Sequence, residues 1–480
     1  MSFWNRRKSI DAANHLDPSR RLKRTLSWYH LVALGVGAIV GTGIYTLIGV
    51  GAERAGPAVI LSFVIAGAVC VCAALAYAEM ASLMPAAGSA YTYTYTVGGE
   101  LLAWIVGWSL ILEYSVVCSA VAVGWSGYAG GFLQAAGIHL PVALLAGAFA
   151  GGVLNLPAVL IIFVVAGMLI VGTRESATVN TALVTVKIIA LVVFIFIGIA
   201  AFKSGNFTPF MPYGFASHTD SGGTRGVMAA AAIIFFAFYG FDAVSTAAEE
   251  ARNPGRDVTW GIIGSMIVCT VLYMAVAAAA LGAMPFMEFA KSPEPLAYIL
   301  RTLGHPLAAT AIGAAAVIAL PTVILAFMYG QSRIFFVMAR DGLLPDRLGH
   351  VNPRTGTPVA MTLFTAIVVS VVAGLFPLED IAAVANAGTL CAFVAVALCM
   401  MVLRVREPNR PRMFKAPLAW LVGPLAVAGC IYLFMNLQGR TREYFFIWNA
   451  FGIVVYLLYS VRNSRLAGAG AGAGAGEVQP

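Results

Sequence analysis

The residues with the clearest chemical potential lie in two apolar stretches whose regular backbone is interrupted. The first stretch, GVGAIVGTGI (residues 35–44), has glycine at four of its ten positions. Each glycine inside a helix costs roughly 1 kcal/mol relative to alanine, so this repetition needs a physical reason. The second stretch, FFAFYGFDA (residues 235–243), places Gly240 between aromatic residues and the ionisable Asp242 in an apolar run. Both patterns predict breaks in helices that are otherwise continuous.

A broken helix offers two kinds of unpaired backbone group. The start of its second half presents N–H groups that attract an anion, and the end of its first half presents C=O groups that attract a cation. A carboxylate next to an ammonium, as in an α-amino acid, fits both. In the first stretch we expect the N–H groups of Gly41, Thr42 and Gly43 to hold the carboxylate, with the carbonyl of Ile39 facing the ammonium. The alternative is that these glycines are only packing notches between helices.

Three further ionisable residues lie within apolar stretches. Lys187 is in the middle of TALVTVKIIALVV, and a charge at the centre of a bilayer costs at least about 2.5–3.5 kcal/mol, so such a residue is functional by default. Lys187 could gain and lose a proton as part of its function, or it could only join its helix to carbonyl groups of the first broken segment. Glu113 and Asp242 are the other candidates for proton coupling, with a purely structural hydrogen-bonding role as the alternative for each.

The composition defines the elements that must position these residues. The chain has 480 residues, of which 60% are hydrophobic and 10% are charged, whereas a soluble domain carries about 25% charged residues. This composition predicts an all-α, polytopic membrane protein. Since a span needs about 20 apolar residues, we predict twelve spans near residues 28–50, 58–83, 101–131, 153–171, 178–202, 227–251, 258–283, 307–338, 358–376, 381–404, 418–436 and 444–461. The apolar stretch 139–152 could be a re-entrant piece or the start of the fourth span.

The distribution of basic residues predicts the orientation. With the N-terminus inside, 21 Lys and Arg residues fall on the cytoplasmic side and seven on the other side, which is the expected bias. Both termini are therefore expected to be cytoplasmic. The N-terminal region lacks an apolar core and is not expected to be a signal peptide. The net charge of +8 is spread over short loops and does not suggest nucleic-acid binding, although the basic residues at 6–8 and 20–24 could touch anionic lipid.

The spacing of the two breaks predicts an internal repeat. They lie five spans apart, which suggests a five-helix unit used twice, the second copy inverted, as in one large class of secondary transporters. We therefore expect helices 1 and 6 to be broken and two extra helices to follow the five-plus-five inverted repeat. The predicted segments are a basic cytoplasmic tail (1–27), the first repeat (28–202), the second repeat (226–404), spans eleven and twelve (417–462) and a flexible Ala/Gly tail (463–480).

Four motifs together resemble a known family. They are GVGAIVGTGIY, AYAEMASLMPAAGSAYTYTY (76–95), FFAFYGFDAVSTAAEEARNPGRD (235–257) and YGQSRIFFVMARDGLLP (329–345). In this order they are similar to the amino acid–polyamine–organocation transporters, and more closely to the bacterial members of the cationic amino acid transporter branch. The resemblance covers roughly residues 25–460 and implies the same broken-helix repeat.

The resemblance also implies roles for single residues. Thr42 and Gly43 match positions that bind the substrate carboxylate, and Ile39 matches a carbonyl that binds the amine. The span-six positions whose carbonyls complete the amine site are Phe236, Ala237 and Tyr239, with Phe236 also capping the substrate. Tyr239 departs from the aliphatic residue expected there.

The resemblance further implies the energy source and the cellular setting. In sodium-coupled relatives the region of Lys187 faces the bound cation, and bacterial members with a lysine there look like proton-coupled symporters. We expect H⁺ as the coupling ion and no other cofactor, in a monomer of the bacterial cytoplasmic membrane. Near the cytoplasmic ends of spans we expect either an inner-gate ion-pair network or solvated charges. These charges are Glu79, Glu249, Glu250, Arg252 and Arg333.

The function predicted from the sequence is import of L-amino acids, with small neutral ones such as alanine preferred. The guessed pocket edges, Phe236, Tyr239, Ile44 and Met328, are apolar or aromatic, and a cationic side chain would need an acidic subsite. A cationic amino acid transporter or exchanger is the alternative, and a channel or a transporter-like sensor is a more distant one. The six histidines show no metal-ligand spacing and no hydrolase motif is visible, so an enzyme is not expected. The seven cysteines lie in apolar stretches without a CxxC motif, so neither a disulfide framework nor a metal site is expected.

Overall fold

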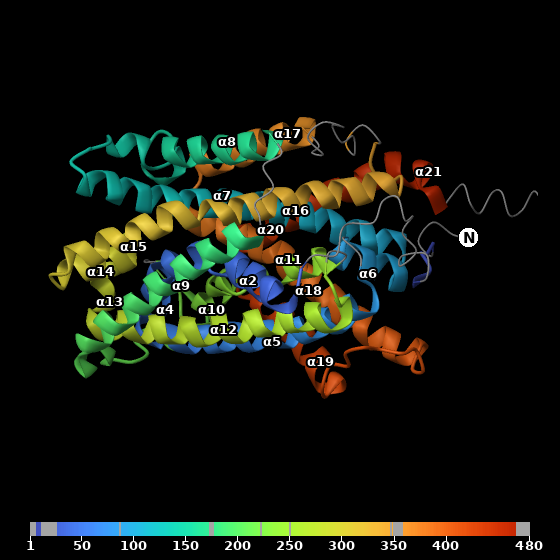
Figure 1. Ribbon diagram of the computed structural model, residues 1–480, viewed down its shortest axis with the longest axis horizontal. Helices are drawn as coiled ribbons and strands as arrows, with labels where there is room; N and C mark the ends of the chain where they lie inside the picture. The colour runs from blue at the N-terminus through green and yellow to red at the C-terminus, as the bar shows by residue number, and fades with distance from the viewer. Residues whose placement is uncertain are drawn as a thin grey trace, which may run out of the picture.

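The computed structural model describes residues 6–10, 26–85, 88–171, 177–220, 223–248, 251–345, 348 and 359–466. Long α-helices that run along one common direction make up most of this structure (Figure 1). Within the described residues, strands occur only in one antiparallel pair, β1 (His218–Asp220) and β2 (Gly223–Arg225), with His218 opposite Arg225. The expected Ala/Gly tail beyond residue 466, most of the N-terminal tail, and Glu249 and Glu250 lie outside the described residues.

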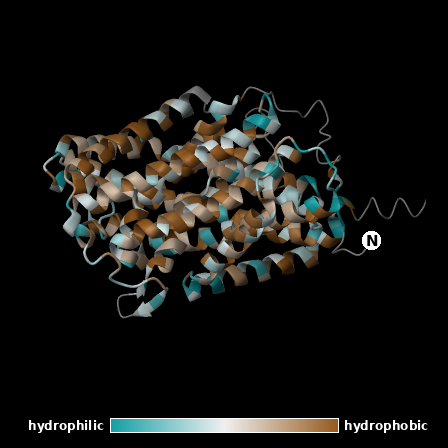
Figure 2. Ribbon diagram, turned by 90° about the horizontal axis from the view of Figure 1, so that it is seen from below, coloured by the Kyte–Doolittle hydropathy of each residue, from teal (hydrophilic) through white to brown (hydrophobic). Residues whose placement is uncertain are grey.

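The described helices are long and apolar enough for a polytopic membrane protein. Eight helical stretches could each cross a membrane by length and composition: Leu47–Leu83, Glu100–Ala135, Thr181–Ala200, Val227–Thr246, Pro254–Ala283, Pro306–Arg340, Leu378–Arg406 and Gly439–Asn463. Four shorter apolar helices accompany them: Trp28–Ile39, Leu156–Val171, Val359–Leu375 and Ala419–Met435. Hydrophobic residues dominate the length of the bundle, and hydrophilic residues gather toward its ends (Figure 2).

The first half of the chain begins with a helix in three pieces. These are α2 (Trp28–Ile39), α3 (Thr42–Tyr45) and α4 (Leu47–Ala55). They are followed by η3 (Gly56–Ala58), α5 (Val59–Leu83), α6 (Ser89–Val97), α7 (Glu100–Ala135), α8 (Leu156–Val171) and α9 (Ala177–Ala200). The apolar stretch 139–152 forms two short 3₁₀ turns, Val142–Leu144 and Ala148–Ala150, before α8 begins at Leu156. The stretch is therefore a loop and not the start of α8.

The second half also begins with a helix in pieces. These are α10 (Val227–Ile234), the 3₁₀ turn η7 (Phe235–Ala237) and α11 (Phe241–Thr246). The remaining helices are α12 (Pro254–Ala283), α13 (Phe286–Phe289), α14 (Pro295–Thr302), α15 (Pro306–Ala319), α16 (Pro321–Arg340), α17 (Val359–Leu375), α18 (Leu378–Arg406), α19 (Ala419–Met435), α20 (Gly439–Val455), the π-helical turn η10 (Tyr456–Ser460) and α21 (Val461–Asn463). Residues 307–338, expected as one span, form two helices that divide at Pro321, which supplies no N–H to continue the preceding helix.

The two interrupted segments lie at the centre of the bundle. In the most apolar 18-residue window of Val227–Thr246, 94% is buried, a larger share than in any other long apolar stretch described. Helix α2 packs along α12 and α9, while α7 packs along α16 and α18. A Cβ at Gly35 of α2 would meet the Ser265 side chain of α12 at 2.5 Å, so this glycine does serve as a packing notch. The surrounding helices thus enclose the backbone that the breaks leave unpaired.

Candidate functional site

The first break falls within the glycine-rich motif. Helix α2 ends at Ile39, where the N–H of Val40 still donates to the Val36 carbonyl at 2.8 Å. Gly41 is extended, and α3 begins at Thr42. The N–H groups of the first residues of any helix have no acceptor within that helix. Thr42 and Gly43 occupy these positions, so the break presents donors where the sequence predicts them.

The second break is opened by a glycine that a larger residue could not easily replace. Gly240 has a φ of +114°, a conformation that L residues rarely adopt. Its N–H donates to the Asp242 carboxylate at 3.1 Å. On the other side of the break, the amide of Asn386 on α18 donates to the carbonyls of Ala232 (2.8 Å) and Ile233 (3.3 Å). One helix of the second half therefore binds the end of α10 directly.

The two breaks touch each other through backbone. A Cβ added to Gly43 would collide with the Cα of Ala237, and one added to Gly240 would come within 2.9 Å of the carbonyl carbon of Ala38. These two glycines permit a close approach of chain segments that lie almost 200 residues apart in the sequence. The unpaired groups of both breaks are consequently gathered in one small region.

A small cavity lies between the breaks. The space inside it that a water molecule can enter is only about 10 Å³, far below the roughly 300–1,000 Å³ of sites for drug-sized ligands. Its lining residues are Ala38, Ile39, Gly41, Thr42, Gly43, Val117, Val121, Phe236, Tyr239, Val323 and Phe327. Six of the seven residues predicted to bind substrate are in this set. The seventh, Ala237, lies behind Gly43.

The sequence did not identify the rest of the lining. Val117 and Val121 come from α7, and Val323 and Phe327 come from α16. They are apolar residues in apolar helices, so nothing in their type distinguished them. The two other guessed edges, Ile44 and Met328, are buried but do not line the cavity.

Two polar groups of the cavity wall have no protein partner among the described residues. They are the hydroxyls of Thr42 and Tyr239, and both atoms are fully enclosed. A buried polar group without a partner costs about 1–3 kcal/mol, so such groups mark places where a ligand can bind. The Tyr239 ring packs edge-on against Phe236, with ring centroids 4.9 Å apart. The carbonyl of Ile39, which is predicted to bind the ammonium of the substrate, accepts a hydrogen bond from the Tyr273 hydroxyl at 2.8 Å. Its second lone pair stays available as an acceptor.

Lys187 lies beside the first break. Its side chain is buried, and its ammonium donates to the carbonyl of Gly37 in α2 (3.0 Å) and to the hydroxyl of Thr322 in α16 (3.2 Å). The hydroxyl of Tyr45 in α3 donates to the Lys187 carbonyl at 3.3 Å. Lys187 thus joins α9 to α2 and α3, the first two pieces of the broken helix, and to α16. The bond to the Gly37 carbonyl is the contact that the structural alternative for Lys187 predicts.

The two candidate acids, Asp242 and Glu113, differ in their partners. Asp242 accepts hydrogen bonds from the hydroxyl of Tyr114 (2.9 Å) and from the N–H of Gly240. Among the described residues, no hydrogen bond of normal geometry satisfies either carboxylate oxygen of Glu113, which is completely buried. Neither acid is among the residues that line the cavity.

At the end of the bundle away from the chain termini, one ion pair joins α4 to α18. Arg54, the penultimate residue of α4, pairs with Glu379 at the start of α18 and donates to the carbonyl of Ala229 in α10 at 3.2 Å. Gln438 also donates to Glu379, at 3.2 Å. A larger hollow at this end is lined by residues of the strand pair, of the segment between α19 and α20, and of the first turn of α20. It contains none of the predicted site residues.

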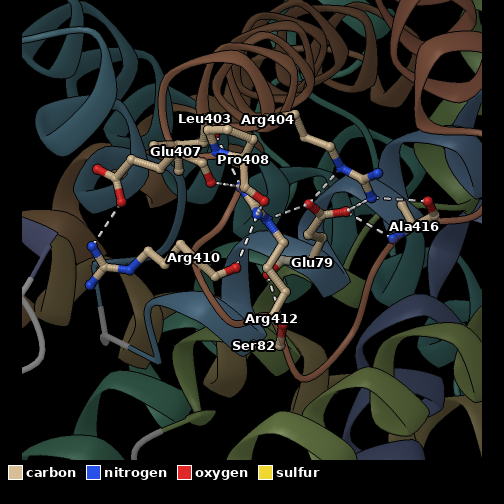
Figure 3. Close-up of polar contacts among 9 residues, drawn as sticks. All are labelled: Glu79, Ser82, Leu403, Arg404, Glu407, Pro408, Arg410, Arg412 and Ala416. Atoms are coloured by element: carbon tan, nitrogen blue, oxygen red, sulfur yellow. Dashed lines mark hydrogen bonds and ion pairs between the residues drawn. The ribbon is translucent and has the colours of Figure 1, made fainter.

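A second network closes the terminus-bearing end, the end of the bundle at which residues 6–10 and 460–466 lie. Glu79 of α5 is 1% exposed and accepts hydrogen bonds from Arg404 (2.9 and 2.5 Å) and from the N–H of Ala416 (2.8 Å) (Figure 3). Arg412 lies 3.2 Å from the same carboxylate and also donates to the carbonyls of Leu403 in α18 and of Glu407 directly after α18. Glu79 therefore belongs to an ion-pair network and is not a solvated charge.

The other charges expected near this end are arranged differently. Arg333 lies over the Tyr329 ring, 4.2 Å from its centroid, and donates to the Tyr329 hydroxyl at 2.6 Å. Arg252 has an exposed side chain, and its N–H donates to the carbonyl of Leu26 at 2.8 Å. Neither residue joins the Glu79 network through the bonds described here.

This arrangement defines a class of protein, a polytopic membrane protein with a small enclosed site at two touching helix breaks. The sequence profile of the family described as amino acid permease matches residues 26–459. The chain belongs to this amino acid permease family, within the amino acid–polyamine–organocation superfamily.

Individual relatives cover nearly the whole chain. The branched-chain amino acid permease BcaP of Bacillus subtilis (strain 168) is 45% identical, over 96% of this chain and 98% of its own length. The methylthioribose transporter of the same organism is 40% identical, over 97% of this chain and all of its own length. The vacuolar cationic amino acid transporter 4 of Arabidopsis thaliana is 37% identical, over 85% of this chain and 68% of its own length. Family membership thus assigns the chain to transport and not to enzymatic catalysis.

Proposed function

We propose that this permease imports neutral L-amino acids with apolar side chains, from alanine to the branched-chain amino acids, by symport with H⁺. The observation that carries the proposal is the cavity between the two breaks. It combines unpaired helix-end groups and two unpartnered hydroxyls with an otherwise apolar wall.

Substrate recognition divides between the two breaks. The α-carboxylate binds the N–H groups of Gly41, Thr42 and Gly43, where the dipole of α3 favours an anion. The ammonium binds the carbonyl of Ile39 and the backbone carbonyls of the second break at Phe236, Ala237 and Tyr239. This assignment satisfies the charges of a zwitterion with backbone groups that the helices leave free.

The wall of the cavity favours a neutral side chain. Val117, Val121, Val323 and Phe327 surround the remaining space, and they offer no hydrogen-bond partner to a charged group. The charged side chain of a cationic substrate would lose its hydration in this apolar wall without gaining a hydrogen-bond partner, and such desolvation is costly. Arginine or lysine transport or exchange remains the alternative, because Glu113 is buried and unpartnered close to the wall.

Proton coupling is assigned to Lys187, with Asp242 and Glu113 as further proton-binding groups. Lys187 contacts the carbonyl of Gly37, two residues before α2 ends, and Thr322 of α16. Loss of its proton would weaken both bonds and free the broken helix to move relative to α16. The substrate and the proton would then act on the same half-helix.

The topology completes the proposal. The eight long and four shorter apolar helices form twelve spans, with inverted repeats at 28–202 and 226–404 and two further spans at 417–462. The breaks in the first helix of each half, in contact with one another, support this division. We place both termini in the cytoplasm, with the protein a monomer in the bacterial cytoplasmic membrane.

The experiment is uptake of labelled L-leucine and L-alanine into proteoliposomes with an imposed pH gradient, acid outside. We expect saturable accumulation that collapses when the gradient is dissipated, and competition by excess leucine, isoleucine, valine and alanine. Competition by arginine but not by neutral amino acids would replace the proposal with the cationic alternative. Competition by methylthioribose alone would reject an amino acid substrate, and a current that does not saturate would indicate a channel.

A further inference from the structure

The N-terminal segment Arg6–Ile10 is docked on the terminus-bearing end of the bundle, near α6 and α21 (Figure 1). The carbonyl of Arg6 accepts a hydrogen bond from the N–H of Glu100 at 2.9 Å, and the N–H of Lys8 donates to the carbonyl of Tyr95 at 3.5 Å. Ile10 is only 7% exposed and packs in the hydrophobic core. The segment therefore has both backbone and apolar contacts with the bundle.

Two acidic side chains face the basic side chains of this segment. Glu100, the first residue of α7, is fully buried, and its carboxylate lies 3.6 Å from the guanidinium of Arg6. The same guanidinium donates to the carbonyl of Val461 in α21 at 3.2 Å. Asp341, directly after α16, accepts a hydrogen bond from the ammonium of Lys8 at 3.0 Å. The segment thus connects α7, α16 and α21 at one point.

Hydroxyl groups hold the two acids in place. Glu100 accepts bonds from the hydroxyls of Tyr95 (3.1 Å), Tyr456 (3.0 Å) and Ser464 (2.5 Å). Asp341 accepts one from the Tyr91 hydroxyl at 3.0 Å. Tyr91 and Tyr95 lie one turn apart on α6, with ring centroids 5.7 Å apart, so one short helix positions both carboxylates. Such support fixes their orientation before a cation arrives.

We propose that Glu100 and Asp341 form a binding site for a basic peptide segment, occupied by the chain's own Arg6–Ile10, and that this docking keeps the terminus-bearing end closed. The docked segment contacts Glu100 at the start of α7, Asp341 directly after α16 and Val461 in α21, so it holds the ends of these helices together. The functional part of this inference rests on the proposed transport function, in which the helix ends on that side must separate to release substrate.

Docking is tested by carbodiimide cross-linking of the full-length protein in membranes. Because the Lys8 ammonium and the Asp341 carboxylate are 3.0 Å apart, the reagent should join them in an amide, detected as a cross-linked peptide by mass spectrometry. Lys8→Arg keeps the charge but lacks the reactive amine, so it should lose only this product. Absence of the cross-link in the unsubstituted protein would overturn the proposed docking.

Closure is tested with a cysteine reporter at Ser245 on α11. Ser245 is fully buried and its hydroxyl lies 2.8 Å from that of Ser89 on α6. Labelling of Ser245→Cys by a maleimide, corrected for the native cysteines with the parent chain, reports opening of this end. Combining it with Arg6→Ala and Lys8→Ala should raise the labelling rate roughly 3- to 10-fold, since each partly exposed ion pair is weak.

Arg7→Ala is the matched control, because Arg7 carries the same charge on an exposed side chain. It should leave the labelling rate unchanged. Equal rates in all variants, or the same increase with Arg7→Ala, would overturn the role in closure. Cross-linking and labelling need no transported substrate, so failure of the proposed amino acid uptake is distinguishable from failure of this inference.

Discussion

Gly43→Ala places a methyl group where the two helix breaks touch. The added carbon would collide with the Cα of Ala237, which is backbone and cannot rotate away as a side-chain tip could. Overpacking costs about 1–3 kcal/mol, and a backbone collision belongs at the upper end of that range. Alanine gains up to about 1 kcal/mol over glycine within a helix. The net cost is therefore about 2 kcal/mol.

This cost should appear in both stability and substrate binding. If the collision pushes the two breaks apart, the full cost of about 2 kcal/mol appears in substrate binding as a roughly 30-fold loss of affinity. We would measure binding of labelled L-leucine to purified protein together with its thermal unfolding. Gly41→Ala is the matched control, because its nearest neighbour, Val323, would lie at an ordinary 3.5 Å and its backbone is extended. It should unfold like the wild type.

Leucine binding and thermal unfolding of Gly43→Ala equal to those of the wild type would refute this prediction. The same effect of both substitutions on thermal unfolding would also refute it. In either case the contact between the breaks would not determine the geometry of the site.

Four further substitutions test separate parts of the structure. Lys187→Met, which keeps the length of the side chain without its charge, should abolish accumulation driven by a pH gradient while leucine binding persists; loss of binding instead would indicate a structural role only. Arg54→Gln removes the ion pair with Glu379 and should lower the free energy of unfolding. The decrease should lie between the values for an exposed pair, about 0–1 kcal/mol, and for a buried pair, about 3–5 kcal/mol. An unchanged free energy of unfolding would show that this pair does not stabilise the contact between α4 and α18. Val323→Ala enlarges the cavity and should raise the affinity for leucine relative to alanine in competition assays, whereas an unchanged ratio would place the side-chain subsite elsewhere. Burial raises the pKa of the Glu294 carboxyl above its ordinary value, although Arg301 opposes the shift. The folded protein therefore holds this proton more tightly than the unfolded chain does, and the contribution of Glu294 to stability falls as the pH rises from the ordinary pKa through the raised one. Glu294→Gln should flatten this part of the pH dependence of thermal unfolding, and an unaltered profile would contradict the prediction.

Part of the site could be predicted because its residues are unusual for their surroundings. Repeated glycine at residues 35–43 and Gly240 beside Asp242 are costly in an apolar helix, so they indicated the breaks. The same argument identified Lys187, whose charge is out of place in a span. The structure places these residues at or beside one small cavity.

The rest could not be predicted because its residues are ordinary where they stand. Val117 and Val323 line the cavity, but no apolar residue of an apolar helix signals which neighbour it faces. The partners of Glu79 lie more than 300 residues away in the sequence, and local patterns carry no information on such pairs. The tyrosines of α6 were part of a recognised motif, yet only their contacts with Glu100 and Asp341 show what two of them do.

The central claim is that the two touching breaks recognise a zwitterion. The most direct measurement compares binding of L-leucine to the purified wild-type protein with binding of L-leucinamide, which lacks the carboxylate, and of N-acetyl-L-leucine, which lacks the ammonium. Each analogue lacks one charged group, so the buried backbone groups that would bind that charge are left without a partner. We therefore predict that both analogues bind roughly 10- to 100-fold more weakly than leucine. Equal binding of leucine and either analogue would contradict the account, since the corresponding break would then contribute nothing to recognition.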